Sequence, residues 1–423
     1  MSELKSMSKD ELMLKRGEYL KEYNNYKEMG LKLDMSRGKP GAKQLDISNE
    51  LLNGPKDFHT AGNLDVRNYG VLAGLPETRE IFSQIFNIPS KNIIIGGNSA
   101  LNLIYDTFAR VYLFGALGST PWVRLPKVKI LCPVPGYDRH FSICEEFGAE
   151  MICVPLKGDG PDMDMVEKLA AEDEAVKGII CVPLYSNPTG EIYSDEVIDR
   201  LVKMKTAASD FRIFWDNAYA IHHIYKENSI ANIFEYAEKY GTQDRIYMFF
   251  STSKVTFPGS GVAIIAASDK NTEEIMKRMS IQTIGYDKVT QLSFAKFFKN
   301  AENVKNHMKK HAAILKPKFD TVIEILEKNF GDNKICRWLK PDGGYFVTIY
   351  TCEGCAKEIV RLAKEAGVVL TEAGATHPYH FNPKDDCFRL APTYPYSEEL
   401  KTAMEVIVAC IKLATADKLL EKM

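Results

Sequence analysis

Seven short apolar runs between about residues 90 and 270 constrain the fold of this chain more than any other feature. They are NIIIGG, VKILCPV, AEMICVPL, VKGIICVPL, FRIFWDN, RIYMFFSTS and VAIIAAS, with loops and helical patterns between them. Runs that are almost wholly apolar are typical of strands buried on both faces of a parallel sheet. Strands that alternate with helical patterns predict an α/β fold, in which helices cover both sides of one sheet.

The pattern changes after about residue 300. A long helical stretch, AENVKNHMKKHAAILKPKFDTVIEILEKNF, leads into PDGGYFVTIY, a further helical stretch and CFRLAPTY. Residues 8–30, at the other end of the chain, have the pattern of a charged helix. We therefore expect a large domain over residues 50–300 and a small α+β domain that residues 1–49 and 301–423 build together.

Composition excludes several classes of protein. The formal net charge of −2 gives no general attraction to nucleic acid or to anionic membranes. No apolar run reaches 18 residues and the first residues mix charges throughout, so we expect a cytoplasmic protein without membrane span or signal peptide. Nine irregularly spaced cysteines indicate reduced core thiols. The isolated Cys352-x-x-Cys355 spacing and the adjacent His222 and His223 are weak metal signals, and we expect no metal site.

Residue types that carry chemistry follow directly after several of these strands. GGNSALNLIYDTF follows the first run and PGYDRHF the second, and SNPTG, DNAY and STSK follow later ones. Ligands of open α/β sheets collect at the carboxyl ends of the strands. Small residues that open a helix form an anion site. A lysine at a buried strand end is costly unless it is paired or chemically used. The set suits a flat, phosphorylated, nitrogen-containing ring.

The motifs resemble those of the fold-type I pyridoxal-phosphate enzymes, in the class I aminotransferase branch. LDMSRGKP, VRNYG, CPVPGYDRHF, GPDMD, SNPTG, WDNAYA, STSK and RLAP occur in the family's order over nearly the whole chain. In detail the chain is most similar to the atypical bacterial aspartate aminotransferases, whose domain also resembles the aminotransferase-like half of MocR-type regulators. The resemblance implies a mainly parallel seven-stranded sheet in the large domain and pyridoxal 5'-phosphate as cofactor.

The resemblance implies catalytic roles for three residues. Lys254 would form the Schiff base with the cofactor aldehyde and later carry the Cα proton, because partial burial lowers the pKa of a lysine. Asp216 would pair with the pyridine nitrogen and keep it protonated, which makes the ring a better electron sink. Tyr219, together with Asn187, would hydrogen-bond the phenolic oxygen of the ring.

Further cofactor contacts follow from the same resemblance. Tyr137 would stack on the ring. The implied phosphate ligands within the chain are Asn98, Ser99, Ser251 and Ser253. Tyr69 would reach the phosphate of the neighbouring subunit, which predicts a homodimer. Ser260 lies near the place where most class I enzymes carry an arginine for the phosphate, so neutral donors and a helix dipole must hold it here.

Like the phosphate contacts near Ser260, the substrate contacts differ from those of the family that the chain resembles. Arg389 would bind the α-carboxylate with its planar fork, beside Gly38 and Asn187. Typical aspartate aminotransferases bind the distal carboxylate with an arginine from the other subunit. The corresponding region here offers only Gln282 and Lys288. The sequence leaves three substitutes open, which are Arg37, Arg139 and His140.

The sequence therefore predicts a ping-pong aminotransferase, most simply an L-aspartate:2-oxoglutarate aminotransferase, with amino acids and 2-oxo acids as partners. Alternatives within the cofactor class are an aminotransferase for aromatic or neutral amino acids, and a lyase. A remote alternative is an effector-binding regulator module. Only about 30 residues precede LDMSRGKP, which is too few for a helix-turn-helix domain, so we expect no nucleic-acid partner.

Overall fold

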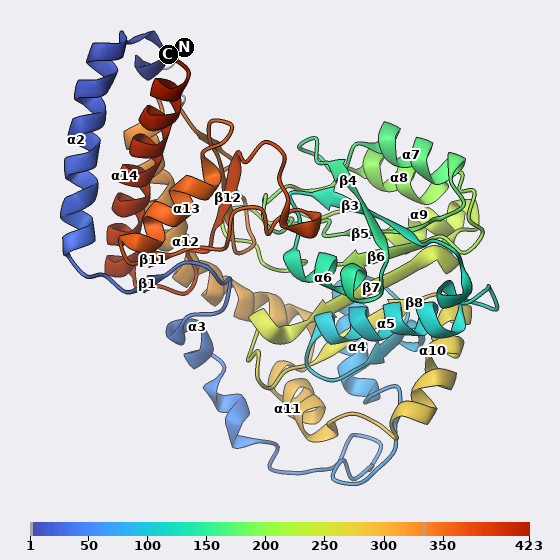
Figure 1. The fold of residues 1–423 in the computed structure, drawn as a ribbon. Coiled ribbons are helices and arrows are strands. Elements are labelled where there is room, and N and C mark those ends of the chain that lie inside the picture. The colour runs from blue at the N-terminus through green and yellow to red at the C-terminus, as the bar shows by residue number, and fades with distance from the viewer. Residues whose placement is uncertain (1–2, 333–334) are drawn as a thin grey trace.

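In the computed structural model, which describes residues 3–332 and 335–423, all seven predicted strands form one sheet (Figure 1). Their spatial order is β2-β8-β7-β6-β5-β3-β4. The strands are β2 Ile93–Ile95, β3 Lys129–Val134, β4 Glu150–Pro155, β5 Val176–Cys181, β6 Arg212–Asp216, β7 Ile246–Ser251 and β8 Ala263–Ala267. Only β8 runs antiparallel to its neighbours, β2 and β7, and β3 to β7 are parallel. The prediction of a mainly parallel seven-stranded sheet is confirmed.

Helices cover both faces of this sheet, as the alternating pattern predicts (Figure 1). One face packs against α5 Ala100–Phe114, α6 Asp138–Glu146 and α10 Asp269–Gln282. The other face packs against α4 Pro76–Phe86, α7 Met163–Glu172, α8 Asp195–Lys203, α9 Ile233–Tyr240 and α11 Lys288–Phe298. Successive side chains of a strand point to opposite faces, so Phe214 lies in one core and Trp215 in the other. Asp216, the last residue of β6, is left at the edge of the sheet.

The two ends of the chain share a separate core (Figure 1). Its helices are α1 Glu3–Ser6, α2 Lys9–Glu28, α12 Ala301–Phe330, α13 Ala356–Glu365 and α14 Ser397–Glu421. Its strands are β1 Leu33–Asp34, β9 Arg337–Trp338, β10 Val347–Tyr350, β11 Val368–Val369 and β12 Cys387–Leu390. β1 pairs in parallel with β11, and β12, β10 and β9 form an antiparallel sheet in that order. The domain boundaries near residues 50 and 300 remain a prediction.

The N-terminal helix begins where its sequence says it should. Ser8 caps α2, since its Oγ accepts the Glu11 N–H while the Glu11 carboxylate accepts the Ser8 N–H at 2.8 Å. Short elements connect the rest of the chain. They are α3 Ala42–Asp46 and the 3-10 helices Asn49–Asn53, Ser90–Asn92, Trp122–Arg124, Gln243–Arg245, Thr252–Lys254 and Pro378–His380.

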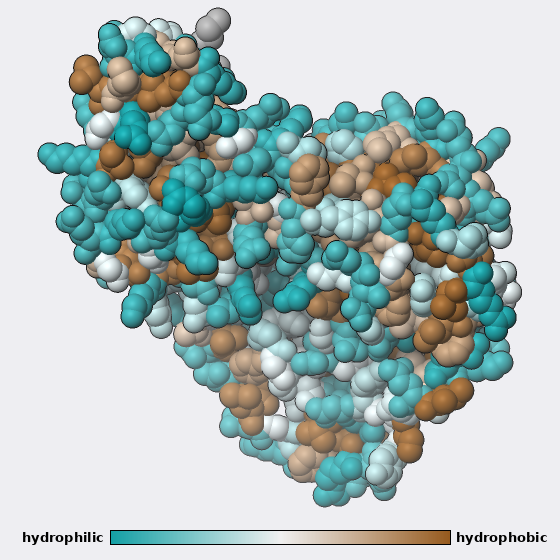
Figure 2. Space-filling model, in the orientation of Figure 1, coloured by the Kyte–Doolittle hydropathy of each residue, from teal (hydrophilic) through white to brown (hydrophobic). Residues whose placement is uncertain are grey.

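One continuous helix, α12, joins the two cores. Val304 and Met308 in its first half pack in the core beneath the seven-stranded sheet. Leu315 and Phe319 in its second half pack in the core that the chain ends share. The surface in Figure 2 is largely hydrophilic, with scattered hydrophobic residues. No helix among the described residues combines the length and apolar character that crossing a bilayer requires.

Candidate active site

A cavity of about 420 Å³ lies at the carboxyl ends of β5, β6 and β7. The predicted site residues that line it are Gly38, Ser99, Tyr137, Asn187, Asp216, Tyr219, Ser251, Ser253, Lys254 and Arg389. Parallel strands end at the same edge of a sheet, which explains why residues far apart in sequence meet here. Two predicted residues, Asn98 and Tyr69, are not among those that line the cavity.

Lys254 ends the short 3-10 helix that follows β7. Its Nζ lies 5.0 Å from the ring centre of Tyr219 and 5.8 Å from that of Tyr345. Burial lowers the pKa of the Lys254 amine, and the charge of Asp216 opposes this shift in part. A lowered pKa increases the unprotonated fraction of the amine at neutral pH, which is the form that acts as nucleophile or base.

Asp216 is buried, and among the described residues only one of its two carboxylate oxygens has a hydrogen-bond partner. Its Oδ2 lies 2.9 Å from Nε2 of His140, which α6 brings over the end of β6. Its Oδ1 is buried and has no hydrogen-bond partner among the described residues. A buried carboxylate oxygen without a donor is costly, so the site is built for a donor from a ligand. His140 is thereby removed as a substitute for the distal-carboxylate arginine, because its ring is buried against Asp216.

Two tyrosines flank this carboxylate. The ring of Tyr137 meets that of His140 edge to face, with centroids 4.9 Å apart. Burial raises the pKa of Tyr137 to about 12 and raises the pKa of Tyr219 well above its ordinary value. Both phenols therefore stay protonated at neutral pH and can donate hydrogen bonds or offer an aromatic face.

Arg389 enters the cavity from β12, on the core that the chain ends share. Its Nη1 donates to Asn187 Oδ1 at 3.1 Å, and its Nη2 donates to Thr371 Oγ1 at 3.0 Å. The carboxylate of Asp138 lies 3.6 Å from Nη1, and the buried Oδ1 of that carboxylate has no hydrogen-bond partner within the described part of the chain. Burial lowers the pKa of Arg389, and Asp138 opposes that shift. The guanidinium is thus oriented in advance, with an anion already beside it.

Phe346, which the sequence analysis missed, explains the glycine at position 38. Its ring centre lies 4.5 Å from Arg389 Cζ. A Cβ atom on Gly38 would lie 2.4 Å from Phe346 Cζ, far inside van der Waals contact. The resemblance implies that Gly38 lies beside the substrate carboxylate, and the closest neighbour of this glycine in the structure is the Phe346 ring. The only available signal was its place in PDGGYF, close to a predicted strand.

Neutral groups lie close together at the start of α5, where the phosphate site is predicted. Ser99 caps α5, with its Oγ accepting the Asn102 N–H at 3.4 Å. The Oγ atoms of Ser251 and Ser253 lie 3.0 Å apart, and Ser253 donates to the Asn98 carbonyl at 3.2 Å. Asn98 itself is exposed at the rim of this group. Hydroxyls at the positive end of a helix suit a phosphate.

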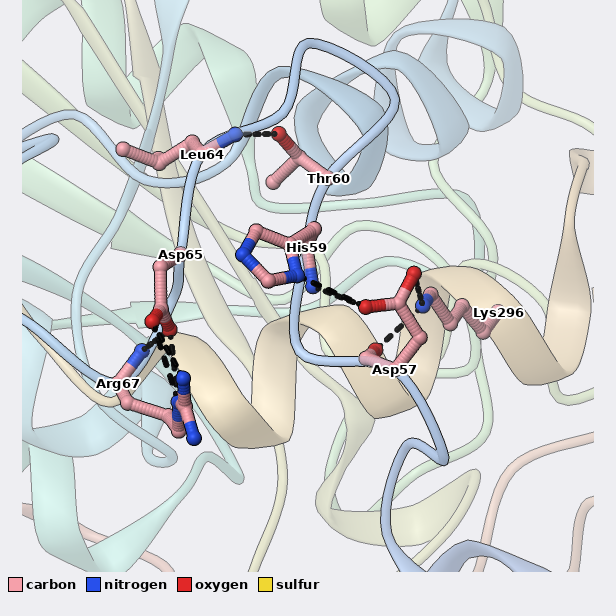
Figure 3. Close-up of polar contacts among 7 residues, drawn as sticks. All are labelled: Asp57, His59, Thr60, Leu64, Asp65, Arg67 and Lys296. Carbon is pink, nitrogen blue, oxygen red and sulfur yellow. Dashed lines mark hydrogen bonds and ion pairs between the residues drawn. The ribbon is translucent and has the colours of Figure 1, made fainter.

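Polar contacts hold the chain segment that precedes Tyr69 (Figure 3). Asp57 accepts from His59 and pairs with Lys296 of α11, while Arg67 pairs with Asp65 at 2.7 Å. The Tyr69 side chain is 79% exposed and lies outside the cavity. Its exposure leaves the Tyr69 ring accessible to another molecule.

The candidates for binding a distal carboxylate differ in whether they line the cavity. Arg37 and Arg139 both line the cavity and are exposed. Gln282 and Lys288 do not line the cavity: Gln282 lies at the end of α10 beside Asp106, and Lys288 is buried in α11. Two of the three substitutes from the sequence therefore remain.

Comparisons with known proteins agree on one family. Residues 7–423 match the family model described as aspartate amino-transferase. A putative aminotransferase of Mycolicibacterium smegmatis is 44% identical over 421 residues, which cover 98% of each chain. An aspartate aminotransferase of Corynebacterium glutamicum is 43% identical over 94% of this chain and 93% of that one.

Solved structures give the same result. The crystal structure of an aspartate transaminase from Corynebacterium glutamicum superposes with a TM-score of 0.96 at 42% identity, over 99% of both chains. The α-aminoadipate aminotransferase LysN of Thermus thermophilus, complexed with N-(5'-phosphopyridoxyl)-L-leucine, shares the fold at a TM-score of 0.73 and 18% identity, over 93% of this chain and 94% of that one.

Replacing Gly38 by alanine tests the contact with Phe346. The added methyl group must displace the ring that packs on Arg389. We expect Gly38→Ala to lower the free energy of unfolding by about 1–3 kcal/mol, as overpacking does. We also expect weaker binding of succinate, a dicarboxylate probe for Arg389. Urea unfolding and titration calorimetry measure the two effects.

Gly17 provides the matched control. It is exposed in α2, and an added Cβ would meet nothing within 4 Å. Gly17→Ala should raise the free energy of unfolding by about 0.5–1 kcal/mol and leave succinate binding unchanged. Wild-type stability together with wild-type succinate binding in Gly38→Ala would contradict the role given to the Phe346 contact.

Proposed function

This chain belongs to the aspartate amino-transferase family, and we propose that it transfers the amino group of L-aspartate to 2-oxoglutarate with pyridoxal 5'-phosphate as its cofactor. It is an aminotransferase, which exchanges an amino group between amino acids and 2-oxo acids. The observation that carries the proposal is one cavity holding a buried amine, a carboxylate oxygen without a partner and an oriented guanidinium, on Lys254, Asp216 and Arg389.

The residues present fit the cofactor. The unpartnered Oδ1 of Asp216 would accept a hydrogen bond from the protonated ring nitrogen, and His140 holds the other oxygen of that carboxylate. Tyr137 would stack on the ring face. Asn187 Oδ1 accepts a hydrogen bond from Arg389. The amide N–H groups of Asn187 are therefore left to donate to the phenolic oxygen of the ring, beside Tyr219. When bound, the ring is an electron sink for the negative charge that develops at the substrate Cα.

The phosphate would lie in the neutral cradle. Its donors would be Ser99, Ser251, Ser253 and the backbone of Asn98, at the start of α5. Ser260 does not line the cavity, and no arginine takes the place of the usual phosphate ligand there. A phosphate held by hydroxyls and a helix dipole is bound through directed hydrogen bonds rather than a full counter-charge.

Each protein group then has one task in the reaction. Arg389 binds the substrate α-carboxylate through its fork and so fixes the direction of the Cα–H bond. Lys254, whose pKa burial lowers toward the unprotonated form, would accept the Cα proton and hold it during the transfer of the amino group. Asp216 would accept from the ring nitrogen of the bound cofactor and favour its protonated form. Asp138 accompanies Arg389 while no carboxylate is bound.

A homodimer completes the proposed site. Tyr69 is exposed and would donate its hydroxyl to the phosphate in the neighbouring subunit. Analytical ultracentrifugation should therefore give twice the monomer mass of 47.7 kDa. A protein that sediments as a monomer while fully active would remove this role from Tyr69.

The visible spectrum tests the cofactor and the substrate together. The purified protein should be yellow, and L-aspartate without any 2-oxo acid should bleach it, because the amino group moves to the cofactor in the first half-reaction. Lys254→Ala should abolish the bleaching. A yellow protein that aspartate leaves unchanged keeps the cofactor but not the substrate, and a panel of alanine and phenylalanine then follows. A protein that stays colourless with added pyridoxal phosphate contradicts the proposal.

Single substitutions of Arg37 and Arg139 separate the two remaining distal-carboxylate candidates. The one that binds this group should lose about 100-fold in kcat/KM for aspartate when changed to alanine, and little for L-alanine, which has no distal carboxylate. Lys39→Ala is the control, since Lys39 lines the same cavity but lies 3.8 Å from the ring centre of Tyr394. Equal losses for both substrates in both arginine variants would exclude a distal-carboxylate role.

A further inference from the structure

Two buried histidines converge on the peptide that follows Lys254. His307 and His311 lie one turn apart on α12. Their Nε2 atoms are 3.0 Å and 2.9 Å from the carbonyl oxygen of Val255. A carbonyl oxygen has two lone pairs and can accept both hydrogen bonds. Two imidazoles on one carbonyl, next to the proposed reactive lysine, are more than packing requires.

The partners of His311 determine which of its nitrogens carries the proton. Its Nδ1 lies 3.2 Å from Nε2 of Gln44, and an amide nitrogen can only donate hydrogen bonds. Nδ1 is therefore the acceptor, and Nε2 carries the proton that goes to Val255. Burial lowers the pKa of His311 to about 4, so its ring is neutral at pH 7 and matches this arrangement. Burial also lowers the pKa of His307.

Gln44 ties this pair to two further segments of the chain. It is fully buried, its Oε1 accepts the Gly41 N–H at 3.1 Å, and its Nε2 also donates to the Tyr345 hydroxyl at 2.9 Å. That hydroxyl lies 3.5 Å from the carbonyl of Lys254. Ser48 Oγ lies 3.1 Å from His307 Nε2. The carbonyls of Lys254 and Val255 are thus both contacted by side chains from outside the large sheet.

Among the described residues, the turn that contains Lys254 has backbone hydrogen bonds at its start only. Val255 N–H and Thr256 N–H both donate to the Thr252 carbonyl at 2.9 Å. Those bonds fix the start of the turn but leave the Val255 carbonyl to the histidines. The lysine amine must reach a reacting carbon repeatedly from the same backbone position, and errors near 1 Å at such a site cost about 100-fold in rate.

We propose that His307 and His311 are positioning residues, whose paired hydrogen bonds to the Val255 carbonyl hold the backbone of Lys254 so that its amine stays buried and correctly placed. The inference rests on the proposed function of Lys254. It extends that function to a helix whose two histidines are not among the residues that line the cavity.

The test compares phenylalanine and glutamine at position 311. Phenylalanine fills the space but donates nothing, whereas glutamine can still donate an N–H to Val255. We expect His311→Phe to lower kcat by about 10- to 100-fold with KM changed less than about threefold. His311→Gln should restore kcat to within about fivefold of the wild type. His307→Phe should have a smaller effect of the same kind, because His311 still holds the carbonyl.

A second readout does not depend on turnover. The rate at which the apoprotein captures pyridoxal phosphate, followed by visible absorbance from pH 6 to 10, reports the protonation of the Lys254 amine. A loosened turn admits water, so His311→Phe should move the midpoint of this profile toward higher pH and slow capture at pH 7. His311→Gln should keep the wild-type midpoint.

Leu315→Ala is the control for stability alone. Leu315 lies one turn further along α12, buried in the core of the chain ends. This variant should melt at a lower temperature but keep the wild-type capture profile. A wild-type profile and wild-type kcat in folded His311→Phe and His307→Phe would overturn the inference and leave the proposed function intact. A wild-type protein that captures no pyridoxal phosphate would overturn both.

Discussion

The hydrogen bond from Arg389 to Asn187 joins two parts of the chain that are 202 residues apart, and the site depends on it. Asn187 follows β5 of the large sheet, whereas Arg389 lies on β12 beside the chain ends. Burying a guanidinium is expensive unless its donors are satisfied. Here Asn187 and Thr371 accept from Nη1 and Nη2, the ring of Phe346 packs against Cζ and Asp138 lies close by, whereas Nε has no hydrogen-bond partner among the described residues. Without this joint the cavity would have a carboxylate and an amine but no clamp for an incoming carboxylate.

The same burial affects the two cations of the site differently. It lowers the pKa of both Lys254 and Arg389. A free lysine amine has a pKa near 10.4, and lowering that pKa increases the neutral fraction of the amine at neutral pH. A guanidinium starts above 12 and stays charged. One desolvated cavity can therefore hold a reactive neutral amine beside a permanent cation, and this distinction explains why the clamp is an arginine and the proposed proton carrier a lysine.

The strands and the main chemical groups that follow them could be predicted from the sequence, because each depends on a local pattern of residues. The apolar runs predict buried strands, and the residues after them fall at one sheet edge. Contacts between distant segments could not be predicted. In the sequence, His140 of PGYDRHF was a candidate to bind the distal carboxylate of the substrate. In the structure it hydrogen-bonds to Asp216, 76 positions away. Periodicity says which face a side chain takes but not which partner another segment brings to it.

The buried histidines illustrate the same limit and add a mechanical point. In NHMKKHAAILKPKF their spacing of four predicts only that they share one face of a helix. The structure places that face on the Val255 carbonyl. Pro317 lies inside α12 just beyond them, where it removes a backbone donor and weakens the helix. Both histidines contact Val255, which packs in the core beneath the sheet, whereas Pro317 lies in the half of α12 that packs with the chain ends.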